Sequence, residues 1–200
     1  MTPRSVSLLA ALALCPIAAL AQDGPAFDCA KAESSAETLI CEDAGLAALD
    51  RRLADRFAAA LAVSEGLDAD AEETTRTLRA MQRGWISGRD ECWKEPDLRA
   101  CIETEYLRRE AELVAEFLLD PPSETLALIC GPRALDVALF ATGLPGVRVE
   151  EGDTVAIGAQ VGMDTPDSYY LRQWGGLEMG GAAPRVSDVQ GHETTCQIQG

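Results

Sequence analysis

The chain of 200 residues has the composition of a folded protein, since 47% of its residues are hydrophobic and 25% are charged. This length allows one domain or two small ones, and the apolar fraction excludes a disordered chain. Its 33 acidic residues outnumber the 17 basic ones, which argues against nucleic acid and anionic membranes as partners. The acidity serves solubility, and it would also attract a cationic partner and speed its approach.

Residues 1–21 have the features of an export signal. Arg4 precedes an apolar run from Val6 to Leu20, and Ala19-Leu20-Ala21 is a cleavage signature of small residues. The run is too short for a membrane span. We therefore expect cleavage after Ala21, a periplasmic protein, and no membrane insertion of the mature chain.

The cysteines separate into one within the signal and six beyond it. A lipid anchor at Cys15 is disfavoured, because Leu14 stands where a lipoprotein site needs a small residue. Cleavage would remove Cys15 and Arg4, leaving 16 basic and 33 acidic residues and a net charge of −17. An even number of cysteines in an exported chain indicates disulfides rather than catalytic thiols. The six are Cys29, Cys41, Cys92, Cys101, Cys130 and Cys196.

Residues 22–120 are predicted to form an all-α bundle of about four helices. A short, partly helical segment spans 27–41, and the next helix has apolar residues every three or four positions. These are Leu46, Leu49, Leu53, Phe57 and Leu61. Two further helices are expected at about 71–88 and 97–119, with Cys92 and Cys101 at the turn between them. Pro121-Pro122 stops helicity and marks a linker at 121–123.

Residues 124–200 are predicted to form an all-β antiparallel small barrel. Short β-like runs alternate with turn signals rich in glycine and proline. The runs lie at 125–130, 135–140, 147–149, 154–157 and 168–171. A domain this small has a thin core, so a disulfide between Cys130 and Cys196 would help it; closing so long a loop contributes ~4 kcal/mol on the chain-entropy model.

Three charged residues interrupt apolar helix faces. Asp50 lies on the face that contains Leu46 and Leu53, and Arg89 and Arg109 occupy similar positions on later helices. A buried carboxylate needs a partner, so we predict an ion pair of Asp50 with these arginines that holds the helices in register. The alternative, a catalytic carboxylate, lacks a second acid, because Glu37 is expected to cap or pair within its own segment.

No constellation for catalysis or metal binding is recognisable in the sequence. The single histidine, His192, excludes a His-rich metal site, and the four N-terminal cysteines lack the close pairs of a zinc site. A phosphate-binding loop, a serine elbow and a Cys–His pairing are also missing from the sequence. We predict no cofactor, no metal and no enzymatic activity.

One segment has the composition of a binding surface. Residues 164–174 combine a turn with two tyrosines, a tryptophan and an arginine, types enriched at interaction hot spots. The candidate binding residues are Asp167, Ser168, Tyr169, Tyr170, Arg172 and Trp174. The alternative is a hairpin whose aromatic side chains fill the barrel core.

The first half of the chain resembles the N-terminal domain of LprI-type lysozyme inhibitors, a small exported helical module. The resemblance covers about residues 27–119 and implies no particular binding residue. Its carriers are Phe27-Asp28-Cys29, Lys31-Ala32, Glu37, Ile40-Cys41, Leu49-Asp50, Gln82, Trp85, Arg89-Asp90, Cys92, Cys101, Tyr106, Arg109 and Leu113.

The second half more weakly resembles the MliC/PliC family of periplasmic c-type lysozyme inhibitors, which are small β-barrels. The carriers are Cys130, Leu135, Val137, Tyr170, Gly181, Val186 and Cys196-Gln197-Ile198-Gln199. The family inserts a loop into the lysozyme cleft with a serine of an S-G-x-x-Y motif and a lysine before a glycine. Here Pro166-Asp167 stand at the Ser-Gly positions, and Gly180 stands at the lysine position. The cation of the family is therefore absent unless Arg172 or Arg185 supplies it.

These observations predict a periplasmic inhibitor or binder of c-type lysozyme, or of another cationic protein, that acts by occluding the cleft. The alternative is an envelope-stress or structural interaction module that keeps the folds but binds another partner. For the cysteines we expect Cys130–Cys196 and the local pairs Cys29–Cys41 and Cys92–Cys101. Crossed pairing among Cys29, Cys41, Cys92 and Cys101 stays open, because an antiparallel bundle brings these four cysteines to one end.

Overall fold

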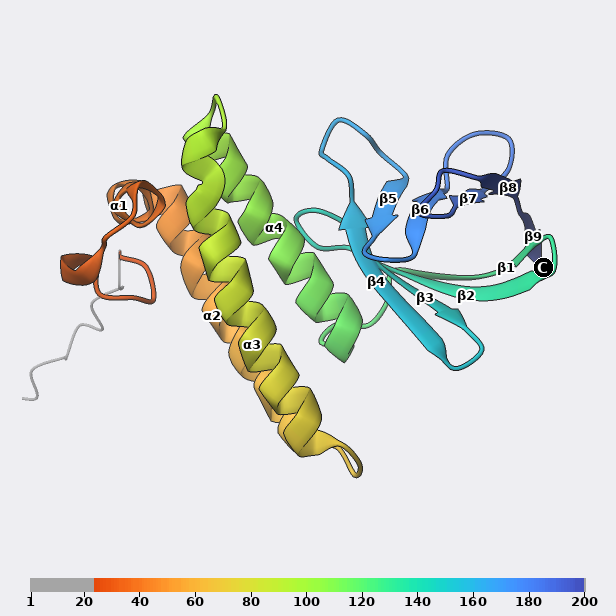
Figure 1. Cartoon of the computed structure of the whole chain (residues 1–200), viewed down its shortest axis with the longest axis horizontal. Coiled ribbons are helices and arrows are strands. Elements are labelled where there is room, and N and C mark those ends of the chain that lie inside the picture. The colour runs from red at the N-terminus through yellow and green to blue at the C-terminus, as the bar shows by residue number, and fades with distance from the viewer. Residues whose placement is uncertain (1–23, 200) are drawn as a thin grey trace, which may run out of the picture.

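The computed structural model describes residues 24–199 (Figure 1). The export signal predicted over residues 1–21, with Cys15, lies outside the described residues. Along the described chain, a helical region that ends at Phe117 is followed by strands that begin at Glu124. This arrangement confirms the predicted fold class, a disulfide-linked bundle of four helices followed by an antiparallel barrel.

The helical region contains four α-helices and two 3₁₀ turns. The helices are α1 (Ser35–Glu42), α2 (Ala44–Glu65), α3 (Ala71–Asp90) and α4 (Leu98–Phe117), and the turns are Cys29–Lys31 and Glu91–Lys94. The side chains of Ser34, Asp43 and Asp97 accept backbone N–H groups in the first turns of α1, α2 and α4. Such caps satisfy donors that a helix start leaves without partners, and they fix where these helices begin.

The six described cysteines form three disulfides. Cys29 pairs with Cys41, Cys92 with Cys101, and Cys130 with Cys196. The local pairing is therefore the one present among the four cysteines of the helical region, rather than the crossed one.

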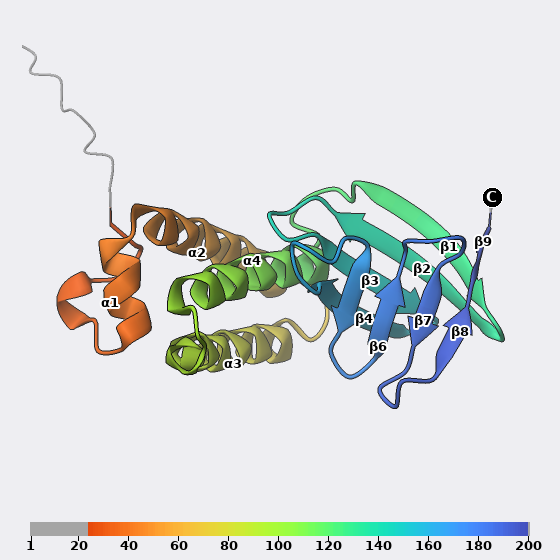
Figure 2. The same ribbon diagram turned by 90° about the horizontal axis from the view of Figure 1, so that it is seen from above.

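Nine antiparallel strands make up the second region. They are β1 (Glu124–Cys130), β2 (Arg133–Phe140), β3 (Gly146–Glu151), β4 (Thr154–Gln160), β5 (Ser168–Leu171), β6 (Gly175–Glu178), β7 (Arg185–Ser187), β8 (Glu193–Thr195) and β9 (Gln197–Gln199). Their order is β8-β7-β6-β5-β4-β3-β2-β1-β9. The two end strands are consecutive in the chain and meet at Cys196, which is bonded to Cys130 at the end of β1. The sheet is thus a near-closed barrel (Figure 2).

Helix α4 belongs to both regions. One face contributes Ile102, Tyr106, Leu113 and Phe117 to the core of the bundle. Another face packs Leu107, Ala111, Val114 and Ala115 against side chains from β2 and β4 and from the β2–β3 connection. Figures 1 and 2 show α4 lying between the other helices and the sheet. The linker predicted at 121–123 joins α4 to β1, and a division there into independently folding domains stays a prediction.

Within residues 24–199, every helix is too short or too polar to cross a bilayer. The barrel has a core of its own, formed by inward-facing residues such as Leu128, Val147, Leu171 and Leu177 together with the Cys130–Cys196 disulfide. The bundle and barrel cores are joined through the two smaller clusters on α4.

Gly146 of β3 lies against the backbone of α4. A Cβ added at Gly146 would lie 2.9 Å from the carbonyl oxygen of Ala111. We expect Gly146→Ala to push α4 off β3 and to lower the free energy of unfolding by about 1–3 kcal/mol, as overpacking does. Chemical denaturation followed by circular dichroism measures this change.

The matched control is Gly180→Ala, where an added Cβ would make an ordinary contact at 3.5 Å with Asp167. The control should unfold at least as late as the parent protein, because replacing glycine by alanine also reduces the entropy of the unfolded chain. Equal stability of the two variants would contradict the close docking of α4 on β3.

Candidate functional site

The segment that the sequence singles out for binding, residues 164–174, comprises the end of the β4–β5 loop (residues 161–167), β5 and the β5–β6 turn. The β4–β5 loop is internally held, because Gln160 Nε2 and Thr165 Oγ1 both donate to the carbonyl of Gly162, at 2.6 and 3.1 Å. Two backbone bonds fix its base, from Val161 to Ser168 and from Met179 to Asp167. The loop is therefore an ordered projection of the barrel, visible above β4 and β5 in Figure 1.

The exposed side chains of this loop and of β5 combine apolar and acidic groups. Met163 and Tyr170 are 69% and 59% exposed, and Val161 is also exposed. Asp164 and Asp167 lie beside them and face solvent. We call these five residues the loop surface. Val161 and Met163 lie outside the predicted set of binding residues, although an apolar pair around Gly162 directly before the D-T-P-D turn was a signal that could have found them.

The structure separates the six predicted binding residues. Tyr169 is buried in the barrel core, as the core-filling alternative predicts for it. Ser168 is half-buried and donates to Glu178 at 2.5 Å. Asp167 and Tyr170 remain at the surface and belong to the loop surface.

The other two predicted residues, Arg172 and Trp174, lie in and beside the β5–β6 turn. Trp174 is half-buried beneath the guanidinium of Arg133, whose carbon lies 4.8 Å from the ring centroid. Arg133 donates to both carboxylate oxygens of Glu151, at 2.9 and 2.6 Å, and so lowers the pKa of that carboxyl. Trp174 is thus held by the barrel itself. Arg172 instead reaches α4, with Nη2 3.5 Å from Oε1 of Glu112.

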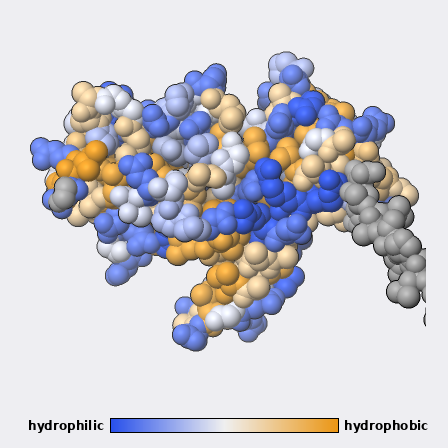
Figure 3. Space-filling model, turned by 180° about the vertical axis from the view of Figure 1, so that it is seen from behind, coloured by the Kyte–Doolittle hydropathy of each residue, from blue (hydrophilic) through white to orange (hydrophobic). Residues whose placement is uncertain are grey.

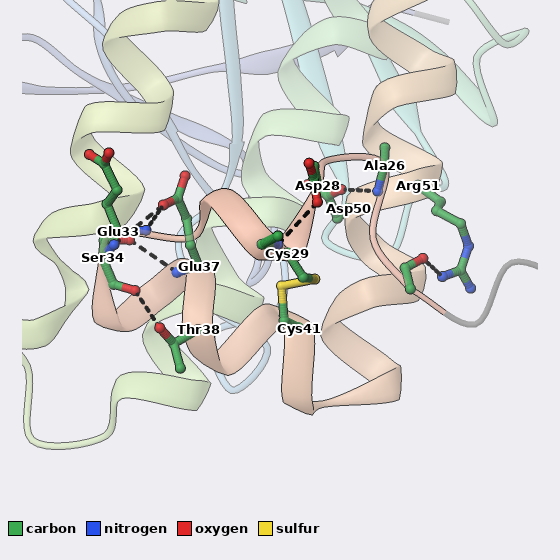
Figure 4. Close-up of a disulfide and its surroundings, with 12 residues drawn as sticks. Ala26, Asp28, Cys29, Glu33, Ser34, Glu37, Thr38, Cys41, Asp50 and Arg51 are labelled. Atoms are coloured by element: carbon green, nitrogen blue, oxygen red, sulfur yellow. Dashed lines mark hydrogen bonds between the residues drawn. A yellow bond between two sulfur atoms is a disulfide. The ribbon is translucent and has the colours of Figure 1, made fainter.

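A second cluster of charged residues lies in the helical region and corrects the predicted ion pair. Asp50 does not contact Arg89 directly; the hydroxyl of Tyr106 lies between them, donating to Asp50 at 2.7 Å and accepting from Arg89 at 2.9 Å. Asp50 also accepts the backbone N–H of Ala26, as Figure 4 shows. The direct partner of Arg89 is Asp90, at 2.7 Å. The physical reason is that Tyr106 enters the bundle between the two charges and supplies a hydrogen bond to each.

This cluster joins three helices and the N-terminal segment. Arg89 also stacks with Trp85 and Tyr106, with distances of 5.6 and 5.9 Å to the ring centroids. Burial raises the pKa of the Tyr106 hydroxyl, which therefore stays protonated and can keep donating to Asp50. An acid that serves in catalysis needs access to a substrate. Here both oxygens of Asp50 are occupied by internal donors, so its arrangement is structural.

Arg109 is separate from Asp50, contrary to the prediction that grouped them. Its partners are Gln82, at 3.1 Å, and Glu112, at 3.4 Å. The side chain is 3% exposed, and its Nη2 atom has no hydrogen-bond partner among the described residues. Burial lowers the pKa of this guanidinium.

Glu37 behaves as the sequence predicts. It completes a capping box with Ser34 at the start of α1, accepting the N–H groups of Glu33 and Ser34 at 2.9 and 3.3 Å (Figure 4). These hydrogen bonds, led by the one from Glu33, lower the pKa of the carboxyl, and Arg89 adds to the effect. Within residues 24–199, no three His, Cys, Asp or Glu side chains are grouped so that they could hold a metal ion.

A further apolar area lies at the far end of the bundle. Figure 3 shows hydrophobic residues on the projecting end where α2 and α3 meet. The exposed Val63 and Leu67 lie in this part of the chain.

Comparison with known proteins finds a family model that matches the helical region. Residues 29–113 match the family model described as "Lysozyme inhibitor LprI". The proteins named "Lipoprotein LprI" from Mycobacterium bovis and Mycobacterium tuberculosis are 30% identical to this chain over 102 residues, which is 51% of this chain. The chain spans 46% of the length of these relatives. No solved structure matches it. The family match ends before β1, so the likeness of the barrel to the MliC/PliC family stays a proposal.

The Tyr106 hydroxyl should contribute measurably to stability. Tyr106→Phe leaves a buried guanidinium and a carboxylate each short of one hydrogen bond, which costs about 1–3 kcal/mol. Urea denaturation measures the loss. The control is Tyr170→Phe, which removes the hydroxyl of an exposed tyrosine and should change the free energy of unfolding by less than about 0.5 kcal/mol. A Tyr106→Phe variant as stable as this control would show that the bridge is unimportant.

The contribution of Glu37 should depend on pH. Its folded-state pKa lies below the ordinary 4.5, so the ionised carboxylate stabilises the fold above that pH, and this stability is lost as the pH falls through the folded pKa. Glu37→Gln keeps an acceptor oxygen but removes the charge at the start of α1, so we expect it to lower the free energy of unfolding by about 0.3–1 kcal/mol at pH 7. The deficit should shrink below pH 4.5.

Glu42→Gln, at an exposed position on the same helix, serves as the control and should shift stability by less than about 0.5 kcal/mol at either pH. Denaturation curves of the three proteins at pH 7 and pH 3 provide the comparison. A constant deficit for Glu37→Gln at both pH values would rule out the ionised carboxylate as its source.

Proposed function

We propose that this protein inhibits a c-type lysozyme, or another cationic cell-wall hydrolase, by placing its loop surface in the substrate cleft. The inhibitor would act as a steric plug, without turnover and without a cofactor. The observation that carries this proposal is the combination of a helical region that matches a lysozyme-inhibitor family with an ordered, exposed loop on the attached barrel.

The composition of the loop surface supports the proposal. A large apolar side chain at the centre of an interface supplies much of its binding energy, provided that a surrounding rim excludes water. Met163 and Tyr170 offer such groups, and the hydrogen bonds around Gly162 hold the loop in one conformation. A loop that is already ordered loses less conformational entropy on binding.

The charge of the protein supports a cationic target. Removal of residues 1–21 would leave a net charge of −17, and Asp164 and Asp167 bring negative charge to the loop surface itself. Opposite net charges accelerate association, and salt screens this effect over about 10 Å at 0.1 M. Binding should therefore weaken as the ionic strength rises.

In our proposal, the loop surface takes over the role of the MliC/PliC residues that this chain lacks. The resemblance implies a lysine at the position of Gly180, and Arg172 and Arg185 are the candidates to replace it. Arg172 lies close to Glu112 of α4, and Arg185 is exposed on β7, two strands away from β5. In our proposal neither cation carries the inhibition; the apolar and acidic side chains of residues 161–170 do.

The three disulfides indicate an oxidising compartment outside the cytoplasm, and the periplasm is our proposal for it. Because the mycobacterial relatives are named lipoproteins, two forms of the exported protein are to be distinguished. Mass spectrometry would find either a chain that begins at Gln22, after cleavage as predicted, or a lipid-modified chain that begins at Cys15.

A cell-wall lysis assay tests the proposal directly. The mature protein, added in micromolar excess to a c-type lysozyme, should lower the lysis rate, and the double variant Met163→Ala/Tyr170→Ala should lose most of this effect. Truncation of two central hot-spot residues commonly costs 2 kcal/mol or more, so we expect the inhibition constant to rise by about thirtyfold or more.

The control variant Val189→Ala/Ile198→Ala removes two other exposed apolar side chains of the barrel. It should inhibit as strongly as the parent protein. If lysis were undiminished and no binding occurred at low salt, lysozyme would not be the target. If the control lost inhibition and the loop variant kept it, the contact surface would lie elsewhere on the barrel.

A second function, as an envelope interaction module with another partner, is favoured by one observation. The lysine implied by the MliC/PliC resemblance is replaced by Gly180. Under this alternative, the protein would leave lysozyme active. Crosslinking of the intact protein in the envelope, with and without the Met163→Ala/Tyr170→Ala substitutions, would then identify a partner whose capture depends on the same loop.

A further inference from the structure

A cavity of about 460 Å³ lies between the helical region and the barrel. Met81 of α3, Arg109, Glu112 and Glu116 of α4, and residues 154–157 of β4 line it, together with Arg172, Gln173 and Trp174 of the β5–β6 turn. Its size falls within the range of small-molecule sites, about 300–1,000 Å³. Arg172 also lines a neighbouring hollow, together with Val161 and Tyr170 of the loop surface. It therefore lies between the cavity and the loop surface.

The charges in this cavity are incompletely paired. Glu112 lies between two arginines, with Oε2 3.4 Å from Nη1 of Arg109 and Oε1 3.5 Å from Nη2 of Arg172. Charge-assisted hydrogen bonds between nitrogen and a carboxylate are typically about 2.7–2.9 Å long. One carboxylate therefore serves two guanidinium groups, and it serves both at long distance.

Burial makes this deficit more costly. Arg109 is almost completely enclosed, and its Nη2 has no hydrogen-bond partner among the described residues. The ion-pair partner of Arg109 is Glu112, whereas Glu116, which also lines the cavity, is exposed to solvent. Arg109 shares Glu112 with Arg172, and a poorly paired buried charge is unfavourable. An anion that pairs with Arg172 would leave Glu112 to Arg109 alone.

The walls determine what kind of anion fits. Met81, Val155 and Ile157 provide apolar surface, and the ring of Trp174 closes another side of the cavity. A bare inorganic anion would leave these groups without contacts. A carboxylate attached to an apolar group would satisfy the arginines and the walls together, as ligand sites with a few polar groups in an apolar lining do.

We propose that the cavity between α3, α4 and β4 binds a carboxylate carried by an apolar group, with Arg172 at its mouth and Arg109 at its floor. The carboxylate takes the place of the long Arg172–Glu112 contact and pairs with the guanidinium of Arg172. Its apolar group packs against Met81, Val155 and Ile157. This chemistry has two sources, a free N-acylated amino acid and the C-terminal residue of a peptide. This proposal does not rest on the proposed lysozyme inhibition.

Binding to the intact mature protein tests the site. N-acetyl-leucine carries the carboxylate and the apolar group, and N-acetyl-leucinamide differs only in lacking the charge. We expect the acid to shift the Trp174 indole N–H signal in a saturable manner by nuclear magnetic resonance, and the amide to bind at least tenfold more weakly, since hydrogen bonds to charged groups contribute the most.

Arg172→Gln is the decisive variant, because this side chain is 61% exposed and its replacement should leave the fold intact. It should weaken binding of the acid at least tenfold. The control Arg185→Gln removes an exposed arginine of β7 that does not line the cavity and should change the affinity by less than twofold.

Three results would overturn the proposal: no shift with the acid at millimolar concentration, equal affinity for acid and amide, or unaltered binding to Arg172→Gln. A tripeptide that ends in leucine with a free C-terminus separates the two sources. Tighter binding of the tripeptide than of N-acetyl-leucine supports a peptide terminus as the ligand, and equal binding supports a free N-acylated amino acid.

Discussion

The structure depends on the burial of α4 on two sides at once. One face of this helix completes the bundle, and the other, which contains Ala111, Val114 and Ala115, lies against the barrel. The small side chains of this second face, opposed by Gly146, let the helix approach the strands closely. A barrel of short strands has a thin core of its own, and docking on α4 extends the apolar area that it buries.

The burial of α4 forces its polar residues to find partners inside the protein. Glu110 is buried and is held by Arg52 at 2.7 Å and by Arg56 at 3.6 Å, both from α2. Arg109, one residue earlier, lines the cavity; it donates to Gln82 at 3.1 Å and reaches its anionic partner, Glu112, only at 3.4 Å. Two adjacent residues of one helix thus differ sharply: one is paired with two cations, and the other lacks a close anion. That difference distinguishes a packed ion pair from a site that can accept a ligand.

Much of the fold was predictable because its strongest signals are local. Helix periodicity, the Pro121-Pro122 stop and the cysteine spacing each act over short stretches of chain, and the bundle, its end and the disulfides follow from them. Strands β6 to β9 were not predicted, since they have three or four residues each and include Gly175-Gly176. Their pairing comes from the closure of the barrel, which no local pattern reveals.

The candidate site was only partly predictable for a related reason. Composition placed aromatic residues at 169–174, but it did not show which of them the barrel core would take. Tyr169 and Tyr170 are neighbours with the same chemistry, and strand alternation buries the first and exposes the second. Likewise, Asp50 needed a partner, as predicted, but the Tyr106 hydroxyl could be identified only when three helices were placed together.

The residues that carry the resemblance to the LprI family include the cysteines, Asp50, Trp85, Arg89, Tyr106 and Arg109, and the structure gives each of them a partner or a packing role inside the helical region. Residues used in this way stabilise the helical region itself. A family signature of this kind therefore identifies a scaffold, and the contacts that select a target are to be sought on surfaces that the scaffold positions. In this chain α4 is the helix that reaches the barrel. Arg172 lies directly after β5, the strand that contains Tyr170, and its side chain contacts Glu112 of α4. In the proposed function, the helical region therefore contributes without contacting the target, because α4 packs against β4, the strand that leads into the loop surface.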